Sequence, residues 1–222
     1  MSNRSGERRE PLSRELIART ALALADREGF ERVTMRRLAR ELGVGTMTLY
    51  GYFRDKEELV DAAIDAASRE QSVALSDESW RERVGSLMRG LRSVLEAHPS
   101  GMRARLGRPL LGPEALRVTE AAMQVLLGAG FSREEAARAY RALFVYTFGF
   151  AAFSSPDDPE ETRRRTRAAL AGLPSSEYPE LTRSIDEAAE AMAGDAQFEY
   201  GLERILDGLE VALAAATGDP PR

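Results

Sequence analysis

The sequence has 222 residues, of which 43% are hydrophobic and 30% charged, and its formal net charge is −5. It contains no cysteine and a single histidine, which excludes disulfides, thiol chemistry and any metal site that needs two imidazoles. No apolar run approaches the roughly 18 residues of a membrane span, and the charged N-terminus lacks an apolar signal core, so we expect a cytoplasmic protein with no membrane partner.

Apolar residues recur with helical spacing in almost every segment, and no stretch alternates with the period of two typical of a strand. The sequence therefore predicts an all-α fold. The first helix is expected to open near Ser13 and to end at Gly29. A short second helix is expected between Thr34, a natural N-cap, and Gly43, which adopts the left-handed conformation without strain.

A third short helix is expected after the glycine turn, ending at Phe53, and a fourth starts at Asp55. Asp55 and Glu58 have the spacing of a capping box. We therefore predict a flexible arm over 1–11 and a three-helix helix-turn-helix domain over 12–71, with its motif at 34–53.

The predicted helices lengthen beyond residue 72. A capping-box pattern at Ser79 opens a helix that reaches Pro99, and shorter pieces are expected at 101–108 and 113–127. Ser132 and Glu135 form another capping-box pattern before a helix over 133–153.

Residues 154–195 open with a loop signal, contain a solvated helix around Arg163 followed by a breaker at Pro174, and are expected to be partly mobile. The last helix is expected over 195–216, and residues 217–222 form a tail. Residues 72–216 are thus a larger helical domain.

The last helix and the 133–153 helix both carry an apolar stripe that suits a four-helix bundle formed across a two-fold axis. Two glycines seven residues apart in the last helix lower its propensity, which is best explained if another helix approaches closely. We expect a homodimer; the alternative is a buried pair within one chain. The predicted interface consists of Tyr140, Leu143, Phe198, Gly201, Leu202, Ile205, Gly208, Leu209 and Ala212.

The outer surface of the helix-turn-helix carries the predicted chemistry. Leu38, Ala39, Leu42, Val44, Leu49 and Phe53 form an inner face. Facing outward are Arg36, Arg37, Gly45, Thr46, Met47, Thr48, Tyr50, Gly51 and Tyr52. Two aromatic rings and a methionine on so short a helix suit base edges, thymine methyls and phosphates better than they suit water.

Charge supports the same interpretation. Residues 1–60 hold 12 basic and 10 acidic side chains, whereas residues 61–222 hold 19 and 26. Arg36 and Arg37 stand in the first turn of a helix, where cations oppose the helix dipole unless an anion neutralises them. We expect a DNA phosphate to be that anion.

The N-terminal domain resembles the DNA-binding domain of the TetR family. The resemblance is carried by Thr34, Arg36, Leu38, Ala39, Leu42-Gly43-Val44, Thr48-Leu49-Tyr50, Tyr52-Phe53, Lys56 and Leu59. It implies that Arg36, Thr46, Met47, Thr48, Gly51 and Tyr52 reach bases, and that Thr34, Tyr50 and Lys56 hold the DNA backbone. Gly51 departs from the family pattern, in which a larger side chain is common.

The closing helix resembles the dimerisation helix of tetracycline-repressor-type C-terminal domains, at Phe198, Gly201-Leu202, Ile205, Gly208 and Val211. The resemblance implies a homodimeric repressor that binds a palindromic DNA operator and is released by a small-molecule effector. No cofactor is expected.

The effector cavity is expected among the helices between about 80 and 150, since an effector must distinguish two arrangements of them. Its candidate residues are His98, Arg105, Gln124, Tyr140, Phe144 and Thr147. A histidine before a Leu-Gly pair holds the magnesium of the drug in tetracycline repressors, and Arg105 stands there in this sequence. Because arginine repels a cation, we predict that magnesium-tetracycline is not the effector and that the chain has no metal site.

Two other functional classes remain open from the sequence. A helical protein-interaction module would share the fold and would not retain DNA. A helical enzyme is disfavoured, because the sequence has no glycine-rich phosphate loop and no nucleophile near a histidine.

Overall fold

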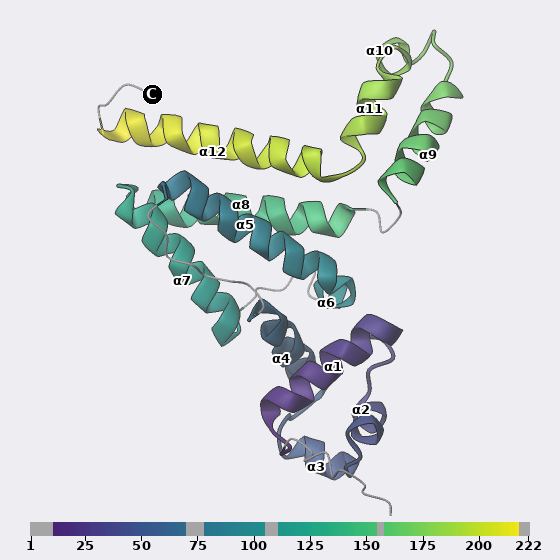
Figure 1. Ribbon diagram of the computed structural model, residues 1–222, viewed down its shortest axis with the longest axis vertical. Helices are drawn as coiled ribbons and strands as arrows, with labels where there is room; N and C mark the ends of the chain where they lie inside the picture. The colour runs from purple at the N-terminus through teal and green to yellow at the C-terminus, as the bar shows by residue number, and fades with distance from the viewer. Residues whose placement is uncertain (1–10, 70–77, 105–110, 155–157, 218–222) are drawn as a thin grey trace, which may run out of the picture. The chain divides into compact units, whose positions relative to one another are not determined.

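The computed structural model describes residues 11–69, 78–104, 111–154 and 158–217. The regular elements in these ranges are all α-helices, which confirms the predicted fold class (Figure 1). None of these described helices combines the length and the apolar character of a membrane span. The helices are α1 (Arg14–Glu28), α2 (Met35–Leu42), α3 (Thr46–Tyr50), α4 (Lys56–Ser68), α5 (Trp80–Ala97), α6 (Pro99–Ala104), α7 (Pro113–Gly128), α8 (Arg133–Phe153), α9 (Pro159–Ala171), α10 (Pro179–Arg183), α11 (Ile185–Ala191) and α12 (Asp195–Thr217).

The chain divides into two compact units. The first unit comprises Met1–Ala74 and Gly90–Ala121, and the second comprises Leu75–Arg89 and Ala122–Arg222. Helices α5 and α7 therefore contribute residues to both units.

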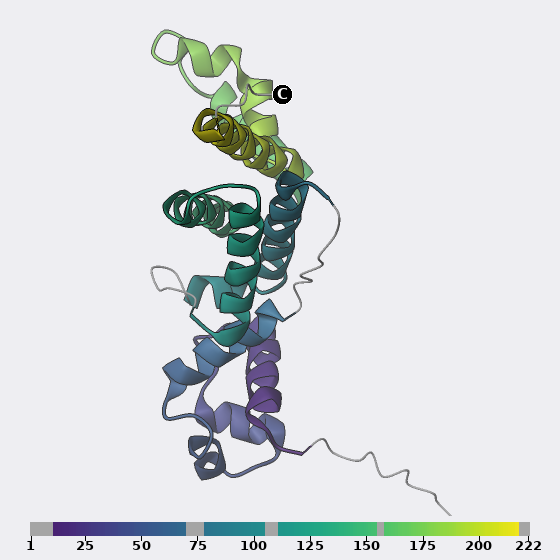
Figure 2. The ribbon, with the colours of Figure 1, turned by 90° about the vertical axis from the view of Figure 1, so that its left-hand side faces the viewer.

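In the first unit, α1 lies along α4 and α2 packs against α1 and α3 (Figure 2). The apolar faces of these helices meet in one core, in which the larger side chains exclude water almost completely. The core includes Ile17, Leu24, Phe30, Val33, Leu38, Leu49, Phe53 and Leu59. Leu42 and Val44 are partly buried against it. The predicted inner face of the helix-turn-helix is thus confirmed.

Side-chain caps define the ends of the short N-terminal helices. The Ser13 hydroxyl accepts a hydrogen bond from the Leu16 amide, and the Thr34 hydroxyl accepts one from the Arg37 amide. Gly43 has φ of 69°, the left-handed conformation predicted for it.

Two predictions for this region need correction. Helix α3 ends at Tyr50 and the chain then turns, with the Phe53 amide still donating to the Leu49 carbonyl, so the helix does not continue to Phe53. At α4, Asp55 accepts from the Glu58 amide as predicted, but the Glu58 carboxylate accepts from the Arg54 amide instead of returning to Asp55. Only one of the two hydrogen bonds of a capping box is present, because the Glu58 carboxylate accepts from Arg54 and Arg14 instead.

In the second unit, α8 packs against α12 around a cluster of aromatic rings. The Tyr146 and Phe198 rings stack with centroids 5.6 Å apart, and Phe150 meets Phe198 edge-on at 5.3 Å. Helix α8 opens with the predicted capping box between Ser132 and Glu135. Its bounds, Arg133–Phe153, are those predicted from the sequence.

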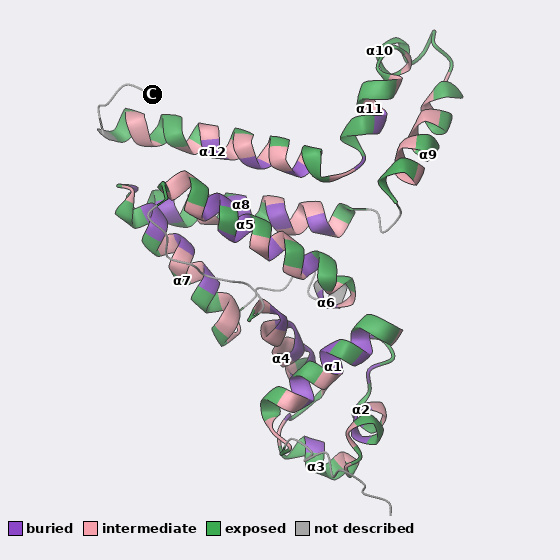
Figure 3. Ribbon diagram, in the orientation of Figure 1, coloured by how far each residue is buried: buried purple, intermediate pink, exposed green. Residues whose placement is uncertain are grey.

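The segment between α8 and α12 differs from the prediction. It forms three helices from Pro159 onward, with α9 beside α11 and α10 connecting them (Figure 1). Neither α9 nor α10 has a buried residue, and the only buried member of α11 is Ala189 (Figure 3). Without an apolar stripe, two of the helices gave no periodic signal in the sequence. Pro159 and Pro179 stand in the first turns of α9 and α10, where the missing amide proton of proline costs no helical hydrogen bond.

Candidate nucleic-acid interface

The element that presents the predicted DNA contacts is a helix of five residues, Thr46–Tyr50. Gly43 turns the chain between α2 and α3, and the Val44 amide donates to the Ala39 carbonyl, which closes the end of α2. A helix this short has little stability of its own, so its position depends on the side chains that it buries.

Helix α3 has one buried side and one exposed side. Leu49 is completely buried, whereas Met47 is 79% exposed and Tyr50 47% exposed. Thr48, Gly45 and Gly51 are exposed and Thr46 is half-buried. The apolar atoms of Met47 and Tyr50 therefore lie in solvent where the sequence predicted a DNA-facing surface, on a helix fixed by the opposite side.

Tyr52 is placed differently from the outward orientation predicted for it. It is partly buried against the core of the first unit, and its hydroxyl donates to the Leu12 carbonyl at 3.1 Å. The ring follows the chain inward because α3 ends two residues earlier. The predicted base contact of Tyr52 is thus not supported by its position, whereas Tyr50, predicted to hold the DNA backbone, is exposed.

Arg14 fixes the end of the same turn. Its guanidinium donates to the Tyr52 carbonyl and to the Glu58 carboxylate, the latter at 2.7 Å, and lies 4.2 Å from the centroid of the Phe53 ring. Hydrogen bonds from the Arg54 amide, then from the side chains of Arg14 and Arg54, lower the pKa of Glu58 from 4.5 to about 2. The α3–α4 corner is therefore held by a charged cluster as well as by its apolar residues.

The two arginines at the start of α2 differ from each other. Arg36 is exposed. Arg37 donates to Glu28 and Glu41, at 2.7 Å each, and these hydrogen bonds, that to Glu28 first, raise the pKa of Arg37. The prediction that a phosphate neutralises Arg37 is corrected, since two carboxylates of the chain already do so.

Thr34 and Lys56, predicted to hold the DNA backbone, both have structural partners. Thr34 is exposed while its hydroxyl caps α2. The Lys56 ammonium donates to the Phe30 carbonyl at 2.8 Å and to the Glu31 carbonyl at 3.4 Å. Lys56 therefore closes the loop between α1 and α2, a role that the sequence pattern did not reveal.

The predicted effector-binding residues are distributed over both units. His98 lies in the first unit, where its Nδ1 is 2.8 Å from an Asp26 carboxylate oxygen. In the second unit Gln124 is exposed, and the buried Thr147 hydroxyl donates to the Leu143 carbonyl. Tyr140 and Phe144 are half-buried, with ring centroids 6.1 Å apart. Arg105 lies outside the described residues.

The predicted dimer seam divides into buried and accessible residues. Leu143, Phe198 and Leu202 are completely buried within one protomer, so their surface is not available to a partner. Tyr140, Gly201, Ile205 and Leu209 are half-buried, and Gly208 and Ala212 are exposed. The same two helices also expose Val211, one of the residues that carry the resemblance to a dimerisation helix, and Val145 and Tyr200, which the sequence pattern did not single out.

Gly201 has an explanation within the protomer. The Tyr146 hydroxyl donates to the Gln197 and Phe198 carbonyls, and a Cβ at Gly201 would overlap it. A Cβ at Gly208 would meet nothing within 4 Å. The close approach that we inferred from both glycines thus occurs at Gly201 inside one chain, and only Gly208 leaves space for another.

Comparisons with known proteins address the family directly. The model for bacterial regulatory proteins of the tetR family matches residues 17–63, and that for the tetracyclin repressor-like C-terminal domain matches residues 74–213. Neither the enzyme nor the interaction module is favoured by these matches.

Individual relatives agree with the family models. The HTH-type transcriptional repressor DrrR1 of Streptomyces coeruleorubidus is 33% identical over 94% of this chain and 81% of its own length. The class A tetracycline repressor protein from transposon 1721, of Escherichia coli, is 34% identical over 87% of this chain and 88% of its own. Among solved structures, ActR of Streptomyces coelicolor without ligand has a TM-score of 0.81 and 30% identity, covering 93% of this chain and 99% of that one. The chain belongs to the TetR family of bacterial transcriptional regulators.

Proposed function

We propose that this chain is a ligand-responsive transcriptional repressor that reads its operator with the exposed side of α3. The observation that carries the proposal is the contrast between Leu49, completely buried, and Met47 and Tyr50, on the opposite side and largely in solvent. Methionine and tyrosine exposed beside threonine hydroxyls provide the apolar and hydrogen-bonding groups that a major groove accepts. Repression takes place in the cytoplasm, where the operator DNA is.

The proposed repressor is a homodimer formed by α8 and α12. Val145 of α8 and Tyr200 and Val211 of α12 are exposed apolar side chains, and Gly208 and Ala212 allow close helix approach. A two-fold axis places two α3 helices in successive major grooves, so the half-sites of the operator lie about 34–36 Å, or a multiple of this, apart.

The base-reading role of α3 is tested by gel shift with fragments of the promoter region of the chain's own gene. Tyr50→Ala should abolish retention, because the ring is the largest group that α3 exposes. Tyr178→Ala is a matched control, since that tyrosine, directly before α10, is 42% exposed. Equal retention by the two variants, or none by the unmodified protein at low salt, contradicts the proposal.

The homodimer is tested by sedimentation and by footprinting. We expect two protected half-sites and a dimer that survives Tyr50→Ala. Protection of a single asymmetric half-site by a monomer would contradict it.

The effector of this repressor is proposed to be a small organic molecule with an aromatic ring. ActR has been solved in complex with actinorhodin. In this chain Tyr140, Phe144 and Phe148 form a ladder of half-buried rings along α8, with centroids 6.1 and 5.7 Å apart, on which an aromatic ligand can stack. A thermal-shift screen of aromatic compounds, followed by release from DNA, identifies it.

Magnesium-tetracycline is proposed not to be the effector, although tetracycline repressors are among the relatives. The proposal rests on the sequence Arg105-Leu106-Gly107, which puts a cation where those repressors hold the metal. Calorimetry should detect no magnesium-dependent uptake of tetracycline, and tight uptake would refute the proposal.

A further inference from the structure

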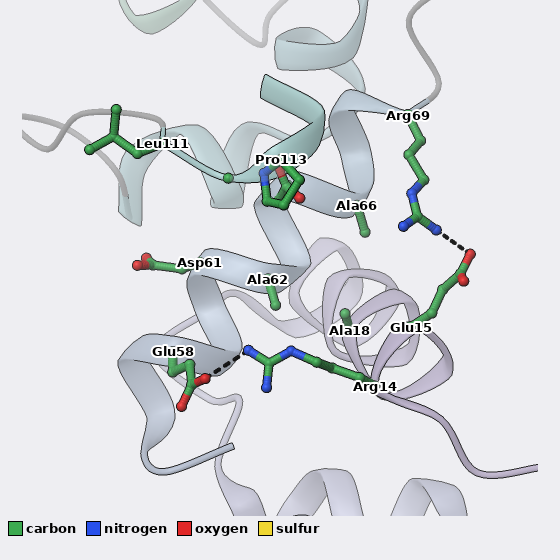
Figure 4. A pocket seen from close by; sticks show the side chains of 12 residues that line it. Arg14, Glu15, Ala18, Glu58, Asp61, Ala62, Ala66, Arg69, Leu111 and Pro113 are labelled. Atoms are coloured by element: carbon green, nitrogen blue, oxygen red, sulfur yellow. Dashed lines mark hydrogen bonds and ion pairs between the residues drawn. The ribbon is translucent and has the colours of Figure 1, made fainter. Parts of the chain in front are cut away.

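The first unit contains a cavity that lies away from the exposed side of α3. It has a volume of about 700 Å³ and lies between α1, α4 and residues 111–113 (Figure 4). Small-molecule sites in proteins typically measure about 300–1,000 Å³, so the cavity has the size of a site for a drug-sized ligand. All its lining residues belong to the first unit.

The floor of the cavity is apolar. Ala18 of α1 and Ala62 and Ala66 of α4 lie between its two ion pairs, and their short side chains leave the space open (Figure 4). Leu111 and Pro113 add further apolar groups to the lining, and Leu111 is 65% exposed. A ligand with an apolar body would cover these surfaces and remove them from water.

The rim is charged, with carboxylates in excess. Four carboxylates line the cavity against two guanidinium groups, those of Arg14 and Arg69. Arg14 pairs with Glu58 and Arg69 with Glu15. The Asp65 carboxylate accepts from the Glu114 and Ala115 amides at the start of α7, which fixes its position beside the cavity. Such walls attract a cationic ligand and repel an anionic one.

We propose that this cavity is a second small-molecule site, which binds an organic cation with an apolar body and is separate from the aromatic ladder of α8. The apolar floor favours a ligand with an apolar body, and the excess of carboxylates favours a positively charged group on it.

The site is coupled to DNA reading through Arg14. The guanidinium that forms one wall of the cavity also holds the Tyr52 carbonyl and lies over the Phe53 ring, directly after α3. A cation that competes for Glu58 weakens this hold and loosens the α3–α4 corner. Bound ligand therefore lowers operator affinity, a consequence that rests on the proposed function.

Fluorescence titration of the full chain with two dansyl probes tests the site. Monodansylcadaverine carries an ammonium group on an apolar aromatic body, and dansylamide has the same body without the charge. We expect saturable binding of monodansylcadaverine, about tenfold tighter than that of dansylamide, which corresponds to roughly 1.4 kcal/mol. Equal affinity for the two probes, or no saturable binding of either, overturns the proposal.

Three variants locate the bound probe. Ala66→Trp fills the floor and should weaken monodansylcadaverine binding at least about tenfold, a loss of roughly 1.4 kcal/mol. Ala168→Trp adds the same ring to an exposed position of α9 and should leave binding unchanged. Asp61→Asn removes one lining charge at nearly constant volume, so it should weaken the cationic probe and not dansylamide. Unchanged binding in both Ala66→Trp and Asp61→Asn places the probe elsewhere and refutes the site.

The proposed effect of the bound probe on DNA binding is measured separately. Monodansylcadaverine should release DNA from the unmodified protein and from Ala168→Trp, and not from Ala66→Trp. Saturable binding at the cavity with unchanged DNA retention overturns the coupling. If the chain retains no DNA at all, the proposed function fails, and the probe titration still decides whether the cavity is a ligand site.

Discussion

The helix-turn-helix and the α9–α11 segment both contain very short helices and stabilise them in opposite ways. Helices α2 and α3 bury Met35, Leu38, Ala39 and Leu49 in a common core. Helices α9 to α11 bury only Ala189 and are joined by exposed ion pairs, such as the two-pronged contact of Arg163 with Glu190 at 2.7 and 2.9 Å.

The difference indicates what each region can do. Exposed ion pairs contribute about 0.2–1 kcal/mol each, so α9–α11 has little local stability and tolerates substitution. Burial of a large apolar side chain contributes roughly 1.5–3 kcal/mol, which fixes α3 from one side and leaves its other side available for recognition.

Removal of the buried anchor of α3 should have the largest effect. Leu49→Ala leaves a cavity in the core and is expected to lower the free energy of unfolding by about 2–5 kcal/mol, measured by urea denaturation. Leu181→Ala in α10, where the leucine is 45% exposed, should change it by less than about 0.5 kcal/mol. Similar losses in the two variants would abolish the contrast between the regions.

The next largest effect is expected at Gly201 in α12, a helix that packs against α8. A methyl group there collides with the Tyr146 hydroxyl, and such overpacking costs about 1–3 kcal/mol. Gly149 in α8 is the matched control, because a Cβ there meets nothing within 4 Å. Gly149→Ala should gain up to about 1 kcal/mol from helix propensity. Thermal unfolding of both variants measures the difference, and a stabilised Gly201→Ala protein would contradict the packing.

Loss of the α2 cap should cost less. Thr34→Ala removes the hydroxyl that accepts from the Arg37 amide and is expected to lower the free energy of unfolding by about 1 kcal/mol. Thr34→Ser keeps the hydroxyl and should retain most of the stability. Equal loss in the two variants would show that the methyl group, rather than the cap, is responsible.

Local features of the fold could be predicted from the sequence, whereas contacts between distant residues could not. The caps at Ser13, Thr34 and Ser132 and the turn at Gly43 depend on residues within one helical turn, and they were found. An apolar stripe identified α1, α4, α5, α8 and α12, each of which buries several side chains. Helices α10 and α11 lack one and were missed.

The errors at the candidate site have the same origin. Arg37 is neutralised by Glu28, which reaches it from α1, and Arg14 meets Tyr52 from 38 residues away. Neither contact can be recognised from residue spacing in the sequence, because each depends on how α1 packs against the helix-turn-helix. The exposed side of α3 could be predicted because the four-residue spacing of Leu49 and Phe53 indicates which side of this segment packs inward.

The charged cluster at the α3–α4 corner makes the smallest and most specific contribution, which pH should reveal. Hydrogen bonds from Arg54 and Arg14 lower the pKa of Glu58 from 4.5 to about 2. A depressed carboxyl pKa stabilises the fold fully above the unfolded value and loses that effect as pH falls through the folded value. Glu58→Gln should therefore destabilise the protein at pH 7, and its difference from the unmodified chain should shrink between pH 5 and about 2. Glu57→Gln at the exposed neighbouring residue is the control, and urea denaturation at each pH gives the free energy of unfolding. If the stability loss of Glu58→Gln is the same at pH 2 as at pH 7, the packing of the Glu58 side chain, rather than its charge, holds the corner.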